Sequence, residues 1–285
     1  MKHKKINKIL QQNKGLLFIF PSLFGVCLFL LFPFIDVVRR SFADTFGINF
    51  VGLENYKMTF SNAAFQVAAK NTVRFVAVCI PILLVLSLII AVFLQRKTIL
   101  SEYVKKGLLV PLAIPVVSIV LLWRIVFDNS GFLNSFLNVF GIAGKDWMNT
   151  EYAFGVLVFS YIWKNLGYNV VLWIVGLSSI PREIYEAAQV DGAGAWKSFC
   201  LITIPNMKST FFTTIVLSLI NSFKVFREAY LVAGNYPDES MYLLQHIFNN
   251  WFQNMEVSKM SAGAVSMSVV MVSIIMLLKR VWEER

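Results

Sequence analysis

The sequence has few charged residues for its length. Only 15% of its 285 residues are Asp, Glu, Lys or Arg, whereas 57% are hydrophobic and the mean hydropathy is +0.66. Soluble domains usually contain about 25% charged and about 45–50% apolar residues. The shortage of charge excludes a disordered chain and disfavours a soluble globular protein. The 26 phenylalanines support this conclusion, because they need lipid or packed helices to cover them.

Cysteine and histidine are also scarce. The three cysteines, Cys27, Cys79 and Cys200, lie far apart and form no CxxC pair, and the only histidines are His3 and His246. A disulfide framework or a zinc site needs these residues in closely spaced groups. We therefore expect no disulfide, no bound metal and no cofactor.

Motifs for catalysis and nucleotide binding are missing. The sequence has no HExxH, no GxSxG and no pair of carboxylates within an apolar run. The segment from Gly192 to Ser198 superficially resembles a P-loop, but it lacks a glycine directly before Lys197 and follows a predicted helix instead of a strand. We therefore expect that this chain is not an enzyme and that any ATP hydrolysis comes from a partner.

What the sequence does contain is a series of long uncharged runs. A helix of about 17–25 apolar residues crosses a bilayer and satisfies its own backbone hydrogen bonds. Six runs have about this length, of which the fourth is interrupted only by Lys164. The third and fifth runs are marginal, and each gains length if Arg124 or Lys224 is counted inside the helix. The predicted fold is an all-α integral membrane protein, with six transmembrane helices in one domain over residues 1–285. The predicted spans are about 15–35, 72–95, 107–127, 152–178, 207–227 and 260–280.

The first run has a second interpretation. Several lysines precede it, as in a secretory signal peptide. However, the run is long, contains Pro21 and Pro33, and is not followed by a small-residue cleavage site. We therefore expect an uncleaved first helix.

Basic residues are distributed unevenly around the predicted spans. They are concentrated at both ends of the chain, in the second short loop and between the fourth and fifth spans, whereas residues 228–258 contain no Lys or Arg and four acids. Cytoplasmic loops are the ones enriched in Lys and Arg, so we predict that both termini are cytoplasmic. The first outer loop, with Arg39, Arg40, Lys57 and Lys70, is an exception. This flanking pattern explains the net charge of +10 better than nucleic-acid binding, which we do not expect.

The loop between the fourth and fifth spans, residues 180–205, breaks the basic pattern. From Arg182 to Asp191 it contains three acids and one base. Pro181 suits the start of a helix, and Gly192 and Gly194 end it. We predict a cytoplasmic helix-turn-helix. A solvated connector is the alternative, but the apolar residues and low charge of this segment favour a surface that binds a partner.

The same loop resembles the EAA motif of membrane subunits of binding-protein-dependent ABC importers. It reads Glu186-Ala187-Ala188, then Asp191-Gly192-Ala193, then Ile202-Thr203-Ile204-Pro205, with Ile204 where Leu is usual. Phe50 to Tyr56 and Ser222 to Phe226 resemble signatures of the carbohydrate branch, which includes the maltose-type and glycerol-phosphate permeases. The likeness covers nearly the whole chain.

The resemblance implies a multi-pass permease subunit in the bacterial cell membrane. In this family the EAA segment seats in a cleft of an ATP-hydrolysing subunit, and its Glu is thought to pair with a basic residue there. The implied coupling residues are Glu186, Ala187, Ala188, Asp191 and Gly192. The implied partners are a second homologous permease, a dimer of ATP-binding subunits, an extracellular solute-binding protein, a sugar-like solute and membrane lipid. Outer loops around 51–57 and 236–250 would face the solute-binding protein.

Polar residues interrupt the fourth predicted span and mark a possible substrate path. Lys164 is costly at membrane depth, and its neighbours at helical spacing carry hydroxyl, amide and aromatic groups suited to a sugar. By resemblance to maltose-type permeases, the residues lining the path are Tyr161, Lys164, Asn165, Tyr168, Ser218, Ser222 and Val225. Two alternatives stay open: these polar groups join helices to one another, or only the partner permease binds the sugar.

Two other classes of function are less consistent with the sequence. A channel or secondary transporter would work without ATP, but secondary transporters usually show internal repeats, and no repeat relates the two halves of this chain. A membrane enzyme is disfavoured because no catalytic constellation is visible.

Overall fold

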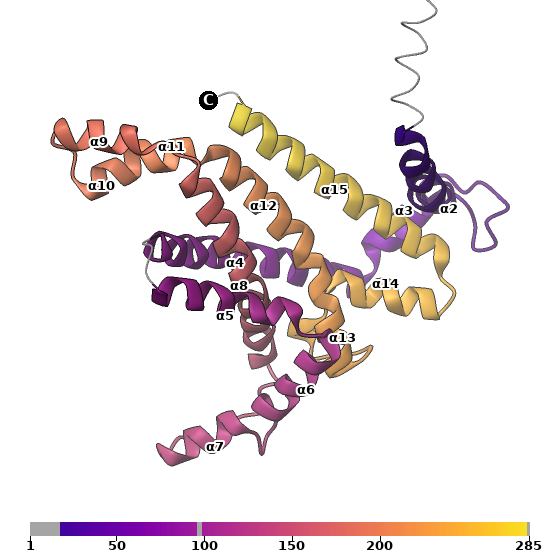
Figure 1. Ribbon diagram of the computed structural model, residues 1–285. Helices are drawn as coiled ribbons and strands as arrows, with labels where there is room; N and C mark the ends of the chain where they lie inside the picture. Colours follow the sequence, from indigo (N-terminus) through magenta and orange to yellow (C-terminus); the bar gives the residue numbers. More distant parts are fainter. Residues whose placement is uncertain (1–17, 96–98, 284–285) are drawn as a thin grey trace, which may run out of the picture. The chain divides into compact units, whose positions relative to one another are not determined.

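The computed structural model describes residues 18–95 and 99–283 (Figure 1). Every regular element in these residues is a helix, and the one extended pairing is an isolated antiparallel bridge between Ala43 and Phe50. The all-α prediction is therefore confirmed for the described residues. The basic N-terminal segment and positions 15–17 of the first predicted span lie outside them. The chain divides into two compact units, Met1–Asn62 with Trp251–Val270 and Ala63–Asn250 with Met271–Arg285.

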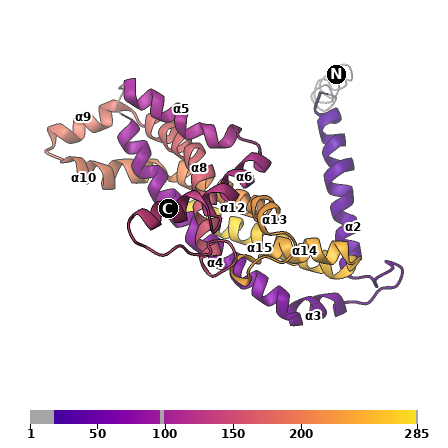
Figure 2. The same cartoon turned by 90° about the horizontal axis from the view of Figure 1, so that it is seen from below.

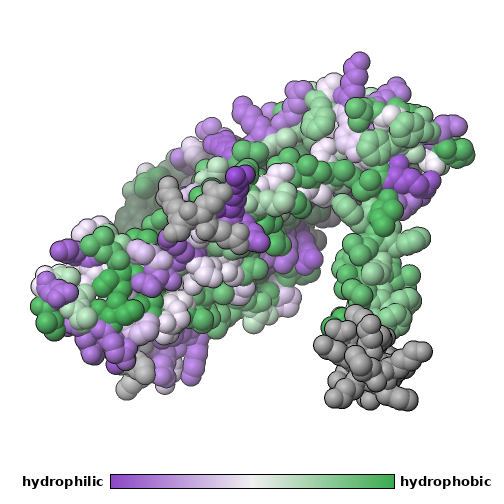
Figure 3. Space-filling view, turned by 90° about the horizontal axis from the view of Figure 1, so that it is seen from above, coloured by the Kyte–Doolittle hydropathy of each residue, from purple (hydrophilic) through white to green (hydrophobic). Residues whose placement is uncertain are grey.

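The first unit begins with a long apolar helix. The stretch Phe18–Ser41 is continuously helical and includes a π-helical segment, η1 (Cys27–Leu31), followed by α2 (Phe32–Ser41). The most apolar part of this helix has no buried residue, and Figure 3 shows its visible face covered with apolar side chains. Such a surface needs lipid or another chain to cover it.

A network of hydrogen bonds closes the loop between α2 and α3 (Glu54–Ser61). Asn55 Nδ2 donates to the carbonyl oxygens of Ser41 and Ala43, over 3.1 and 2.7 Å, and the hydroxyl oxygens of Tyr56 and Ser41 are 2.8 Å apart. Two residues of the predicted carbohydrate-branch signature thus have a structural role, because they hold the end of α2.

Two of the basic residues in the first outer loop form ion pairs with Asp36. The Asp36 carboxylate accepts hydrogen bonds from Arg40 Nε at 2.7 Å and from Arg39 Nε at 3.1 Å. A local carboxylate therefore pairs with two of the four basic residues that depart from the charge asymmetry.

The core of the second unit joins three long helices: α4 (Ala63–Leu94), α8 (Tyr152–Ser178) and α12 (Lys208–Ser222). Trp173 of α8 is fully buried, donates its Nε1 hydrogen to Ser87 Oγ on α4 over 2.8 Å, and contacts the Phe211 ring of α12 edge-on. Figures 1 and 2 both show α4 and α8 side by side. The buried indole finds its polar partner inside the apolar core, which fixes how these helices pack.

The remaining elements are short or intermediate in length, except for the last helix. They are α5 (Ile99–Ala113), α6 (Val116–Phe127), α7 (Phe132–Val139), α9 (Arg182–Val190), α10 (Ala195–Ser198), η2 (Phe199–Thr203), α11 (Ile204–Asn206), η3 (Phe223–Val225), α13 (Phe226–Ala233), η4 (Glu239–Met241) and α14 (Leu244–Gln253), and a long last helix, α15 (Val257–Glu283), ends the described residues.

Several described helices are long and apolar enough to cross a membrane. Four stretches meet both conditions alone: Phe18–Ser41, Ala63–Leu94, Val116–Val139 and Val257–Trp282. A fifth is a pair, Ala195–Asn206 and Lys208–Val225, bent by 67°. Helix α8 has the bounds predicted for the fourth span but is not among them, because its polar side chains lower its hydropathy. The exact number of spans therefore stays a prediction.

The segment of the predicted third span is not one continuous helix. Helix α5 ends at Ala113, and α6 starts at Val116 after a break. Pro115 occupies the position before α6 with φ −57° and ψ 143°, which is outside the helical region. Proline has no amide hydrogen and disfavours helical geometry in the residue before it. A search for uncharged runs does not detect this break, because proline carries no charge.

The segment before α14 is tied to α4. Asn71 Nδ2 donates to the carbonyl oxygens of Glu239 and Tyr242, and the Leu244 amide donates to Thr72 Oγ1. Next to this junction the imidazole of His246 is fully buried, and its Nδ1 accepts a hydrogen bond from the Leu243 amide over 3.1 Å. Because Nδ1 is the acceptor, Nε2 carries the proton, and the ring is neutral.

We predict that His246 makes the protein less stable in acid. Burial lowers the pKa of His246 from 6.5 to about 4, so the unfolded chain binds a proton between these values and the folded chain does not. The contribution of His246 is thus complete above pH 6.5 and falls as the pH decreases to 4, by about 3 kcal/mol in total. Thermal unfolding from pH 7 to 4 should show a shallower pH slope for His246→Gln than for the natural protein. Equal slopes would contradict the prediction.

Candidate functional site

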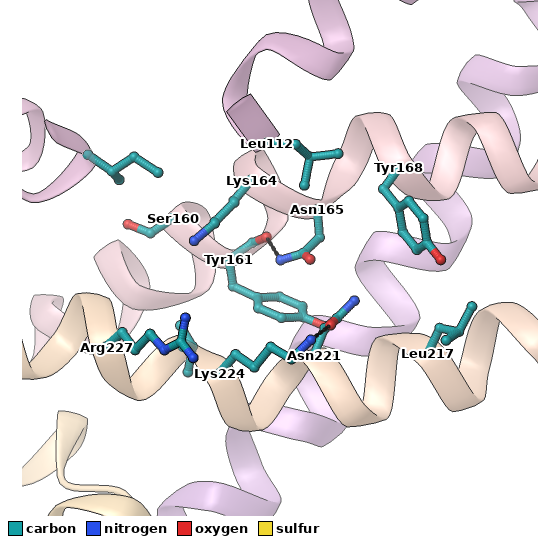
Figure 4. A pocket seen from close by; sticks show the side chains of 12 residues that line it. Leu112, Ser160, Tyr161, Lys164, Asn165, Tyr168, Leu217, Asn221, Lys224 and Arg227 are labelled. Atoms are coloured by element: carbon teal, nitrogen blue, oxygen red, sulfur yellow. Dashed lines mark hydrogen bonds between the residues drawn. The ribbon is translucent and has the colours of Figure 1, made fainter. Parts of the chain in front are cut away.

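A cavity lined by polar and apolar side chains lies in the second unit beside the middle of α8. It has a volume of about 410 Å³, within the range of roughly 300–1,000 Å³ common for small-molecule sites. Figure 4 shows the side chains of α8 on one side and those of α12 and the segment after it on the other. The described lining residues are Leu112, Ile119, Ser160, Tyr161, Lys164, Asn165, Tyr168, Leu217, Asn221, Lys224, Val225 and Arg227.

The four α8 residues predicted from helical spacing all line this cavity. They share one face because α8 is unbroken from Tyr152 to Ser178. Asn165 Nδ2 donates to the Tyr161 carbonyl oxygen over 2.8 Å, which orients its amide. Tyr168 projects from α8 toward the side where Leu217 lies (Figure 4). The cavity therefore presents an amide, a phenol and an ammonium group from a single helix.

Tyr161 also joins two helices. Its side chain is 2% exposed, and its hydroxyl donates to the Ser218 carbonyl oxygen on α12 over 2.7 Å. The ring packs edge-on against Phe75 of α4. The Tyr161 hydroxyl is thus engaged with backbone, so the residue shapes the cavity wall.

Two of the three predicted residues of the fifth span are not among the described lining residues. Ser218 is buried and donates from Oγ to Asn169 Oδ1 over 3.0 Å, and Ser222 Oγ donates to the Leu219 carbonyl oxygen over 2.6 Å. The third, Val225, does line the cavity. The two serines thus satisfy their hydrogen bonds within and between helices, which corresponds to the helix-contact alternative.

Three other residues, from the end of α12 to the start of α13, line the cavity on the side that faces α8. Asn221, Lys224 and Arg227 line it at intervals of three residues. The helix tightens into a 3-10 turn at η3, where side chains three positions apart nearly eclipse one another. Lys224 Nζ donates to Asn221 Oδ1 over 2.9 Å. None of these three is among the site positions carried over by resemblance. Their spacing and the basic residues beside an apolar run were the available signals.

The predicted coupling segment is an exposed helix, a turn and a second helix. Helix α9 has no buried residue, and Gly192 in the turn has φ +77°, a left-handed conformation that favours glycine. The amides of Gly192 and Ala193 close the end of the helix by donating to the carbonyl oxygens of Gln189 and Ala188. Figure 2 shows α9 and α10 next to each other.

This helix pair holds itself together while exposing apolar surface. The Tyr185 hydroxyl and Thr203 Oγ1 are 2.8 Å apart, which joins α9 to the segment after α10. Val190 is 88% exposed and Trp196 is 77% exposed, and Glu186, Ala187, Asp191 and Gly192 are exposed, whereas Ala188 is half-buried. Exposed apolar side chains beside carboxylates are suited to contact with another protein.

Comparisons with known proteins agree with this arrangement. Residues 71–285 match the family described as "Binding-protein-dependent transport system inner membrane component". The arabinooligosaccharide transport permease AraP of Bacillus subtilis is 30% identical over 225 residues, covering 77% of this chain and 72% of AraP. The lactose transport permease LacF of Rhizobium radiobacter is 28% identical over 274 residues, covering 93% and 92%.

Solved structures show the same fold. A chain of a bacterial ABC transporter involved in the import of the acidic polysaccharide alginate superposes with a TM-score of 0.85 at 20% identity, and the alignment covers 98% of this chain and 99% of that chain. The match of the family over most of the chain decides the assignment. The chain belongs to the inner membrane components of binding-protein-dependent transport systems, among the ABC importer permeases that include the sugar permeases.

Proposed function

We propose that this chain is one of two permease subunits of an ATP-driven importer for a sugar or related solute. The observation that carries the proposal is a cavity lined partly by polar side chains and an exposed helix-turn-helix within one compact unit. The cavity offers amides from Asn165 and Asn221 for hydroxyl groups, and an aromatic face from Tyr168 for a sugar ring. In this proposal the chain forms half of the translocation path.

The helix pair α9–α10 is the proposed contact with the ATP-hydrolysing subunit. Glu186 is exposed on α9 and would pair with a basic residue of that subunit, while Ala187, Ala188 and Asp191 form the surface around it. The bond between Tyr185 and Thr203 lets the pair move as one body. Closure of the ATPase dimer would then be transmitted through this pair to the helices around the cavity.

The other partners follow from surfaces the chain leaves uncovered. The exposed apolar helix Phe18–Ser41 would be covered by lipid or by the second permease. The outer loops around 51–57 and 236–250, in which Leu53 and Tyr236 are exposed, would receive the solute-binding protein. Including α8 and counting only the Lys208–Val225 arm of the bent fifth stretch, six helices would cross the bacterial cell membrane, with both termini in the cytoplasm.

Co-purification and uptake test the proposal together. The full-length chain, expressed with its partner subunits, should co-purify with an ATP-binding subunit and support ATP-dependent uptake of a sugar presented by the solute-binding protein. Failure to recover an ATP-binding subunit, together with solute uptake that continues without ATP, would contradict an ABC importer and indicate a secondary transporter.

We predict that Val190 is cytoplasmic and Tyr236 is extracellular. Both side chains are well exposed, 88% and 75%, so a cysteine at either position can react. In a background without Cys27, Cys79 and Cys200, a membrane-impermeant thiol reagent should label Tyr236→Cys in intact cells. It should label Val190→Cys only after the cells are opened. Labelling of Val190→Cys in intact cells would reverse the predicted orientation.

A further inference from the structure

We propose that the cavity beside α8 accepts an anionic saccharide, a sugar that bears a carboxylate, sulfonate or phosphate group. This inference rests on the proposed function, since it names the class of solute that the importer moves. It starts from the charge of the cavity wall: Lys164, Lys224 and Arg227 all line it, and none of the described side chains that line it is Asp or Glu.

The placement of these cations concentrates positive charge in one space. Lys164 comes from α8, whereas Lys224 and Arg227 come from the segment that faces it. Figure 4 shows the ends of Lys164 and Arg227 directed toward each other across the cavity. Lys164 is half-buried and Lys224 and Arg227 are exposed, and like charges gathered around one space repel one another. An anion between them converts this repulsion into attraction.

The two ammonium groups and the guanidinium group are suited to bind one acidic group on a larger polar molecule. A guanidinium group binds the paired oxygens of a carboxylate, sulfonate or phosphate in a fork, and an ammonium group adds a compact charge. Lys224 is oriented by its hydrogen bond to Asn221 Oδ1. Tyr168 and Asn165, which line the same cavity, are available to the ring and hydroxyl groups of the sugar.

A neutral sugar would not explain why three cationic side chains line the cavity. Its hydroxyl groups are matched by amides, phenols and hydroxyls, which the cavity also contains. Each additional cation within a membrane-embedded helix bundle is costly and usually marks an ion or substrate pathway. Three cations around a single cavity therefore indicate a charged solute.

The test compares uptake of matched sugars by the assembled importer. The probes are a glucose disaccharide and its derivatives bearing a carboxylate, a sulfonate or a phosphate, supplied with the importer's own solute-binding protein to proteoliposomes that contain ATP. The variants are Lys164→Gln and Arg227→Gln, with Lys164→Arg to restore the charge. Lys70→Gln, which changes an exposed lysine of α4 outside the lining set, is the matched control. Because the solute-binding protein is the same throughout, differences among variants arise in the permease.

We expect Lys164→Gln and Arg227→Gln each to reduce the maximal uptake rate of at least one acidic derivative by about 10-fold or more, as loss of a charged hydrogen bond implies. Lys164→Arg should recover much of the rate, and Lys70→Gln should leave it unchanged. ATPase stimulation by the solute-binding protein should persist, because the coupling helices are unaltered.

Three results would overturn the inference. Efficient uptake of only the neutral disaccharide would refute it while leaving the proposed function in place. Equal loss of neutral and acidic uptake, with less assembled importer recovered, would show that the cations pair with carboxylates of the second permease. Absence of ATP-dependent uptake of every probe, without an associated ATP-binding subunit, would reject the proposed function and this inference together.

Discussion

Replacing Gly167 with alanine is expected to disrupt the packing of α5 against α8. A methyl group at this position would collide with the carbonyl carbon and oxygen of Leu108 on α5, and it would lie 3.2 Å from the Leu108 Cβ. These are mainly backbone atoms, so relief requires α5 to move away instead of a side chain rotating. Overpacking usually costs about 1–3 kcal/mol, and we expect the upper end or more because the obstacle is backbone.

Thermal unfolding of the purified protein in detergent measures this effect. A cost of about 3 kcal/mol would lower the unfolding midpoint by roughly 5 °C for a chain of this size. Gly155→Ala is the matched control, since Gly155 lies in the same helix and an added methyl group would meet no atom within 4 Å. Alanine favours helix over glycine, so the control should be neutral or slightly stabilised. Equal midpoints for the two variants would show that α5 does not approach α8 this closely.

Replacing Glu186 with alanine is expected to separate the permease from its ATPase while leaving the protein folded. Glu186 is exposed on α9, so its loss removes little from the fold. In the proposed complex it would be buried against a basic residue, and removing one partner of a buried charge pair costs about 3–5 kcal/mol. This corresponds to a loss of roughly 100-fold to several thousand-fold in affinity. Co-purification of the ATP-binding subunit and ATP-dependent uptake would both fall.

Two comparisons distinguish lost coupling from lost structure. Glu183→Ala removes an exposed carboxylate from the first turn of the same helix and should cost only about 0.3–1 kcal/mol. Gly192→Val should reduce ATPase association by straining the turn, because φ is +77° there, whereas Gly192→Asn should retain it, since asparagine tolerates this conformation. Normal ATPase association and uptake in Glu186→Ala and Gly192→Val would eliminate the proposed coupling role.

Local sequence patterns predict the helices and turns whose ends depend on nearby residues alone. Helix α8 has the bounds predicted from a run that only Lys164 interrupts, and the turn after α9 lies at the predicted glycine. Four α8 residues share a face because the helical repeat requires it. The break before α6 is not visible in the distribution of charge, because Pro115 interrupts the helix without carrying any.

The side of the cavity opposite α8 is formed by α12 and the segment after it. Which of their residues line it depends on how these distant segments pack against α8. Of the positions carried over by resemblance, Val225 lines the cavity, whereas Ser218 and Ser222 hydrogen-bond to helix groups. Asn221 and Lys224 also line the cavity. A displacement of one residue rotates a side chain by about 100° around a helix, and the 3-10 turn at η3 changes the repeat again. Helical spacing alone cannot supply this rotation.

The sequence by itself determined the all-helical architecture, the polar face of α8 and the exposed turn at Gly192, because each follows from the periodicity or the residue preferences of a short segment. Only the tertiary structure decided that Lys164 shares a cavity with Lys224 and Arg227, and that Gly167 meets the backbone of Leu108. The physical reason is that helical periodicity relates residues a few positions apart, whereas the cavity and the close approach depend on how separate helices pack and rotate against one another.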